Sequence, residues 1–116
     1  MNLLEQSDDK ILTIINPIMD NLMDASTEIN YQKHIKDFSL RILNHISSEG
    51  FEEMCKDYQN KKGFFTNRQF IFLFKRESSI AVVWKQSFTK VKGDFIAEAI
   101  FIEENNKVVV DHVLIL

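Results

Sequence analysis

The sequence contains few of the residues on which several common kinds of functional site depend. Cys55 is its only cysteine, so an internal disulfide and a cysteine-rich zinc site are excluded. Three glycines among 116 residues form no glycine-rich phosphate loop. No serine lies in a nucleophile-elbow pattern. The fingerprints of nucleotide-binding proteins and of α/β hydrolases are therefore missing.

Charge and hydropathy argue against two further classes of protein. The formal net charge is −3, and the lysines and arginines alternate with acids, so no basic stripe could bind nucleic acid. No stretch approaches the roughly 20 apolar residues of a membrane helix. Residues 1–10 carry three acids and no apolar run, unlike a secretory signal. We therefore expect no nucleic-acid or membrane partner and a cytoplasmic location.

The composition that is present is that of one globular domain. Apolar residues make up 45% and charged residues 27% of the chain, which is typical of a protein with a packed core. Ten phenylalanines indicate that this core is aromatic. We expect a single α+β domain over residues 1–116, with helices over about 3–62 and a sheet over about 64–116.

The first half of the chain has helical periodicity. Apolar residues recur at three- and four-residue spacing over residues 3–25. Pro17 interrupts this stripe, which predicts either a kink or a short leading helix followed by a longer one. Asn30 can cap a short second helix, and residues 51–60 predict another. Gly63 is a plausible stop, because glycine tolerates the left-handed conformation that ends helices.

After Gly63 the period changes from 3.6 to 2. Four strands rich in Val, Ile and Phe are predicted at about 66–76, 79–89, 94–104 and 107–115. Their short connections force neighbouring strands to pair in antiparallel fashion. The predicted fold is therefore a set of N-terminal helices packed on a curved four-stranded antiparallel β-meander, a cystatin-like roll.

The turn lengths predict a strand register. A two-residue loop at 105–106 places Ala99 opposite His112. A four-residue loop at 90–93 places Trp84 opposite Ala99. These three residues then form one row on the more apolar face, which we expect to pack on the helices. Because alanine is small, the row predicts a dent between an indole and an imidazole, which is a usual form of a small-molecule pocket.

The candidate ligand pocket combines this inner face with polar side chains of the short second helix. Its predicted members are Trp84, Gln86, Ala99, His112, Tyr31 and His34. An alternative is a small isomerase or dehydratase that uses His112 as a general base, with Tyr31 or Gln86 beside it. The three histidines of the chain lack metal-ligand spacing, so we expect no metal and no cofactor.

The opposite face of the predicted sheet mixes charges with many β-branched residues. A face that met only solvent would be more polar, so we expect a homodimer through this outer face. The first strand is ambiguous, because Phe70, Phe72 and Phe74 alternate with other apolar residues. A two-residue turn at 77–78 would put these phenylalanines on the outer face, and a bulge would reverse them.

The order of helix, short helices and meander resembles the nuclear transport factor 2-like superfamily and its bacterial branches of unknown function. The stretch 16–39 is similar to its usual opening, and the residues at 63–68, 81–88, 96–104 and 108–113 are similar to its sheet. The resemblance implies a cone-shaped pocket that holds an acid or a His–Asp pair in the enzymes of this superfamily. The inner face predicted here has no acid, so the resemblance favours a non-catalytic binding or interaction domain.

Overall fold

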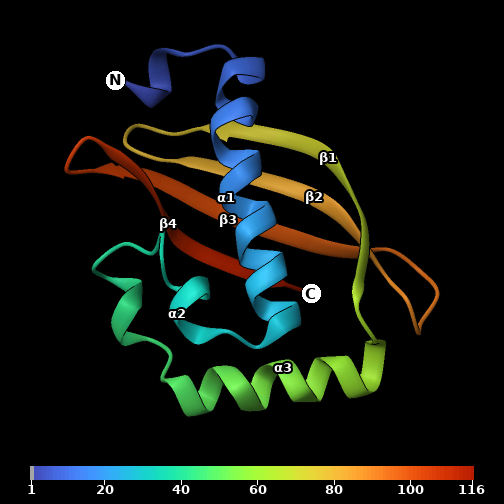
Figure 1. The fold of residues 1–116 in the computed structure, drawn as a ribbon. Helices are drawn as coiled ribbons and strands as arrows, with labels where there is room; N and C mark the ends of the chain where they lie inside the picture. Colours follow the sequence, from blue (N-terminus) through green and yellow to red (C-terminus); the bar gives the residue numbers. More distant parts are fainter. Residues whose placement is uncertain (1) are drawn as a thin grey trace.

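The computed structural model describes residues 2–116. A four-stranded antiparallel sheet with strand order β1-β2-β3-β4 carries the helices on one face (Figure 1). Helix α1 crosses this face, and α3 lies beyond one edge of the sheet, where β1 bends away to meet it (Figure 1). The sheet is not closed into a barrel, and the predicted α+β architecture is confirmed.

Helix α1 extends over Asp8–Glu28 without interruption at Pro17. The predicted split at this proline is therefore wrong. The break lies earlier, between a 3-10 turn at Leu3–Glu5 (η1) and the Ser7 side chain, which caps α1 by accepting from the Lys10 amide at 3.2 Å. A serine at this position satisfies an amide that has no partner within the helix.

Two short helical elements and one longer helix connect α1 to the sheet. As predicted, the Asn30 side chain caps the short helix α2, Tyr31–His34. A 3-10 turn at Ile42–Asn44 (η2) precedes α3, which covers Ser48–Lys62. Between α2 and η2, Phe38 pairs in parallel with Val110 of the last strand. This pairing ties the connection to the sheet.

The strands occupy Phe65–Lys75 (β1), Ile80–Phe88 (β2), Phe95–Glu104 (β3) and Lys107–Ile115 (β4). All bounds lie within one residue of the prediction. The turn at Asn105 and Asn106 has two left-handed residues, with φ of 55° and 62°, as a tight hairpin requires.

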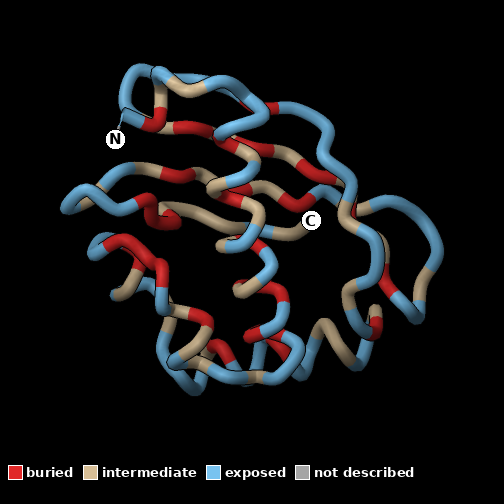
Figure 2. Tube along the Cα trace, turned by 45° about the horizontal axis from the view of Figure 1, so that its top comes forward, coloured by how far each residue is buried: buried red, intermediate tan, exposed pale blue. Residues whose placement is uncertain are grey.

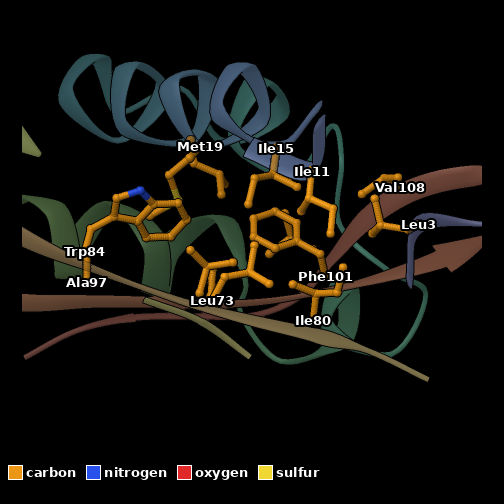
Figure 3. Close-up of a cluster of buried hydrophobic side chains, with 14 of the residues drawn as sticks. Leu3, Ile11, Ile15, Met19, Leu73, Ile80, Trp84, Ala97, Phe101 and Val108 are labelled. Carbon is orange, nitrogen blue, oxygen red and sulfur yellow. The ribbon is translucent and has the colours of Figure 1, made fainter. Parts of the chain in front are cut away.

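The register differs from the prediction between β2 and β3. Trp84 lies opposite Ala97 rather than Ala99, and Ala99 lies opposite Val82. The shift is two residues, so each side chain stays on its predicted face. Trp84 and Ala99 are 2% and 1% exposed and belong to the core, where Met19 of α1 lies beside the indole (Figure 3).

A second difference from the predicted register lies between β3 and β4, and it moves the residues of β4 after Val110 to the opposite face of the sheet from the one predicted. Phe101 lies opposite Val110 as predicted, but a bulge follows at Asp111, so His112 pairs with Ile100 and Val113 with Ala99. The prediction that His112 faces the helices is therefore wrong. One extra residue in a strand exchanges the faces of all residues beyond it, and Val113 takes the inner position.

The first strand also contains a bulge, at Ile71. Phe72 and Phe74 pair with Val83 and Ala81 and are exposed on the outer face, while Phe70 lies opposite Trp84. Burial therefore follows the inner face of the sheet and the facing side of α1, and the outer side of β1 is open (Figure 2).

Candidate functional site

An apolar pocket of about 170 Å³ lies where α1 and α3 meet the ends of β1, β2 and β4. We call it the α1–α3 pocket. Its lining consists of Leu22, Met23, Ser26, His34, Met54, Tyr58, Lys62, Phe65, Phe88, Val113, Leu114 and Ile115. A cavity of roughly 150 Å³ lined by aliphatic and aromatic side chains can hold a benzene-sized molecule. The space therefore suits a compact apolar group.

His34 and Ser26 are the buried polar side chains of the described pocket lining. The His34 ring lies between Phe51 and Phe38, at centroid distances of 4.4 and 5.1 Å, and is 7% exposed. Burial lowers the pKa of His34 to about 4, against a smaller opposing effect of a backbone hydrogen bond with Leu22. The imidazole is therefore neutral near pH 7.

One nitrogen of this ring has no partner. His34 Nδ1 is buried and makes no hydrogen bond within residues 2–116. A neutral imidazole carries a proton on one ring nitrogen and accepts at the other. A buried ring nitrogen without a partner is costly, so a molecule that hydrogen-bonds to this ring is rewarded.

A hydroxyl pair forms a second polar point on the wall. The hydroxyls of Ser26 on α1 and Tyr58 on α3 are 2.7 Å apart, and Ser26 Oγ is 3.4 Å from the Cys55 Sγ. Burial raises the pKa of Tyr58 and of Cys55, so both stay protonated at neutral pH. These groups link the two helices. They offer no nucleophile, because a thiol reacts as the thiolate.

Lys62 supplies the charge of the pocket. Its Nζ lies 4.7 Å from the ring centroid of Phe95 and 5.5 Å from that of Phe88. Such contacts attract a cation to an aromatic face and hold it in place. Among the described residues that line the pocket no acid is present, so Lys62 gives it a positive end.

The six residues predicted for the pocket are not brought together. Trp84 and Ala99 lie in the core, and Gln86, 1% exposed, donates its amide to the backbone oxygens of Ser87 and Asn67 at 3.0 and 3.3 Å. The Tyr31 hydroxyl donates to the Ile46 oxygen at 3.0 Å. Of the six, only His34 lines the α1–α3 pocket.

His112 belongs to a different environment. Its Nε2 lies 2.9 Å from Glu98 Oε2 on the outer side of the sheet, and both side chains are about one-third exposed. The strand bulge before it is held by Asp111, which accepts from Ser39 Oγ at 2.7 Å and Arg41 Nε at 3.0 Å. Burial acts to raise the pKa of Asp111, but these hydrogen bonds outweigh it and lower the pKa.

The sequence analysis missed Ser26, Tyr58 and Lys62. Ser26 continues the apolar stripe of α1 at i+4 from Leu22, a position where a polar residue could have indicated a hydrogen bond inside the fold. Nothing in the sequence around Lys62 distinguishes it from the neighbouring Lys61. Its role depends on phenylalanines from β2 and β3, which only the fold brings near.

No group of three His, Cys, Asp or Glu side chains within residues 2–116 is placed to hold a metal ion. No helix in the same range combines the length and the apolarity needed to cross a membrane.

Comparisons with known proteins identify the fold. No protein-family model matches the sequence, and no curated protein matches it. Among solved structures, a designed protein of the nuclear transport factor 2 type superposes with a TM-score of 0.64 at 11% identity, covering 93% of this chain and 100% of the design. A DUF4783 family protein from Bacteroides uniformis gives 0.53 at 17% identity, covering 83% and 93%.

A third structure, of a SEC-C motif containing protein from Rhodopseudomonas palustris, gives a TM-score of 0.57 at 8% identity, with 89% of each chain covered. Identities this low describe the fold alone. The chain has the nuclear transport factor 2-like fold, and its structural neighbours include bacterial proteins of a family of unknown function. The predicted resemblance is confirmed at this level.

Proposed function

We propose that this chain is a non-catalytic domain that binds a small, largely apolar molecule in the α1–α3 pocket. The observation that carries the proposal is an apolar cavity of about 170 Å³ whose wall includes His34, a buried imidazole with an unpartnered ring nitrogen. Most ligand sites combine such an apolar wall with a few polar atoms that orient the ligand. The imidazole would gain a hydrogen-bond partner when a ligand binds.

The proposal is tested with indole, a small apolar probe that carries one N–H donor. We expect indole to shift the amide resonances of residues around the pocket in two-dimensional NMR. Val113→Phe places a larger side chain in the cavity and should weaken this binding at least tenfold. Val83→Phe makes the same change on the outer face and should leave it unchanged. Equal binding by both variants would contradict the proposed site.

The alternative of an isomerase or dehydratase receives no support from the arrangement of its residues. The imidazole of His112 points away from the helices toward Glu98, and the Tyr31 hydroxyl is engaged by the Ile46 backbone. General acid–base catalysis needs both groups within reach of one substrate. The binding domain is therefore the function that the geometry favours.

We also propose that a second copy of the chain covers the outer sheet face. Phe72, Phe74 and Ile96 expose about half of their surface there. On this side Lys85 Nζ lies 3.9 Å from Asp94, and His112 is hydrogen-bonded to Glu98. A twofold-related copy would bring apolar surface to apolar surface.

The dimer is tested by sedimentation velocity at micromolar concentrations, where we expect dimers. Phe72→Glu introduces a charge into the centre of the apolar surface and should raise the dissociation constant at least tenfold. Leu40→Glu is the matched control, because Leu40 is 67% exposed on the connection between α2 and η2. Sedimentation of the unmodified chain as a monomer alone would refute the dimer.

A further inference from the structure

The α1–α3 pocket has chemically different ends. Near the start of α3, the His34 ring lies 4.4 Å from the Phe51 ring and lines the pocket as a neutral imidazole, which has one acceptor nitrogen. At the last residue of α3, Lys62 presents an ammonium group over Phe88 and Phe95. The lining residues of α3 extend from Met54 to Lys62, a rise of about 12 Å along the helix axis. A molecule in the pocket therefore meets an acceptor at one end and a cation at the other.

The wall between these ends is apolar and partly aromatic. The rings of Tyr58, Phe65 and Phe88 contact one another at centroid distances of 5.1 to 6.3 Å. Val113 faces them from β4, in the position that the bulge at Asp111 gives it. Flat rings pack favourably against such edges and faces. This wall suits an aromatic body better than a polar one.

We infer that the pocket selects a small aromatic carboxylic acid with a hydroxyl at its far end, the carboxylate at Lys62 and the hydroxyl donating to the unprotonated nitrogen of the His34 imidazole. The inference rests on the proposed function and narrows it to one ligand class. A carboxylate would complete the ion pair that the lining lacks, since no acid of the described lining neutralises Lys62. The hydroxyl would give the buried imidazole a hydrogen-bond partner.

Three related probes separate these contributions. 3-(4-Hydroxyphenyl)propanoate carries both groups, 3-phenylpropanoate lacks the hydroxyl, and 4-(3-hydroxypropyl)phenol lacks the carboxylate. We expect the first to bind to the unmodified protein about tenfold more tightly than the second, because a hydrogen bond to a buried acceptor is gained. We expect it to bind about threefold more tightly than the third, since Lys62 is partly exposed to solvent.

Two variants assign the preferences to residues. His34→Phe keeps an aromatic ring between Phe38 and Phe51 and should abolish the preference for the hydroxylated acid over 3-phenylpropanoate. Lys62→Gln should abolish the preference for carboxylate over alcohol. Lys61→Gln is the matched control, because Lys61 is paired with Asp57 and lies outside the pocket lining. Both preferences should persist in that control.

The possible outcomes separate a failure of the proposed ligand class from a failure of the proposed binding pocket. If all three probes bind with equal affinity, and Val113→Phe weakens all of them, the pocket binds ligands but the selection is refuted. The selection is also refuted if both preferences persist in His34→Phe and Lys62→Gln. If no probe binds and indole also fails to bind, the proposed function is refuted as well. Isothermal titration calorimetry measures each affinity, and circular dichroism checks that each variant is folded.

Discussion

We expect Gly63→Ala to lower the free energy of unfolding by about 3 kcal/mol or more. Gly63 has φ of 85° and ψ of −147°, a conformation in which residues with a Cβ are strained. A Cβ at this position would lie 2.2 Å from Thr89 Oγ1, 2.9 Å from the Lys90 Cβ and 3.0 Å from the Lys90 amide nitrogen. The backbone strain and the steric collision therefore both lower the stability of the folded variant.

The collision lies at a junction that joins two parts of the fold. Gly63 connects α3 to β1, and the Thr89 amide donates to the Phe64 oxygen at 2.9 Å while the Lys90 amide donates to the Lys62 oxygen at 3.0 Å. Moving the backbone away from the new methyl group would break these hydrogen bonds. The loss should appear in urea denaturation as a lower midpoint with an unchanged slope.

Gly93→Ala is the matched control for this prediction. Gly93 also has a positive φ, 104°, but nothing lies within 4 Å of the position that its Cβ would take. This control isolates the backbone strain, which we expect to cost about 1 kcal/mol. If Gly63→Ala were no less stable than Gly93→Ala, the close approach of Thr89 to Gly63 would be wrong.

Much of the fold could be predicted because local residues determine it. The change of period at Gly63 separates helices from strands, and two consecutive asparagines at 105–106 favour the left-handed conformations of a tight hairpin. The prediction for the pairing of Phe101 with Val110 is correct for this reason. The Asn30 cap acts over three residues and is predicted for the same reason, whereas the Ser7 cap, which acts over the same distance, was missed.

The candidate site could not be predicted, because a bulge that depends on distant residues decides which side chains face it. Asp111 is held by Ser39 and Arg41, about 70 positions earlier in the sequence, and the backbone of residues 37–39 pairs beside Val110. Nothing within β4 itself indicates this contact. The alternation of strand residues therefore predicts His112 on the inner face, whereas the bulge places Val113 there.

The polar atoms of the pocket illustrate the same limit. His34 is predicted in a ligand pocket from its position on the short second helix; it lines the α1–α3 pocket, whereas the residues predicted beside it lie elsewhere. Ser26 and Tyr58 come from helices whose mutual packing no local pattern specifies. The hydrogen bond between them has a sequence separation of 32 residues.

The stability of the unmodified protein should fall by up to about 3 kcal/mol between pH 6.5 and pH 4 because of His34 alone. The pKa of His34 is lowered from 6.5 in the unfolded chain to about 4 in the folded protein. Between these values the unfolded chain binds a proton that the folded protein excludes. The contribution of neutral His34 to the free energy of unfolding is therefore complete above pH 6.5 and is lost progressively as the pH falls. It changes no further below pH 4.

The effect is isolated by comparing urea denaturation of the unmodified chain and of His34→Phe across this range. Carboxylates titrate in both proteins, so the change with pH in the difference between the two stability curves reports His34, and the unmodified chain should lose up to about 3 kcal/mol relative to the variant between pH 6.5 and pH 4. His45→Phe serves as the control, because His45 is exposed, and its difference from the unmodified chain should stay nearly constant. A His34 ring that titrates near pH 6.5 by NMR would contradict the prediction.

Protonation of His34 should also affect ligand binding in the α1–α3 pocket. Protonation makes both ring nitrogens of His34 donors, so a hydroxyl could no longer donate its proton to the ring. A bound ligand whose hydroxyl donates to neutral His34 should in turn lower the pKa of the ring below about 4, because it stabilises the uncharged form. Titration of the His34 ring with and without 3-(4-hydroxyphenyl)propanoate measures this shift. An upward shift on binding would mean that the ligand favours the protonated imidazole, and the acceptor role of this ring would be wrong.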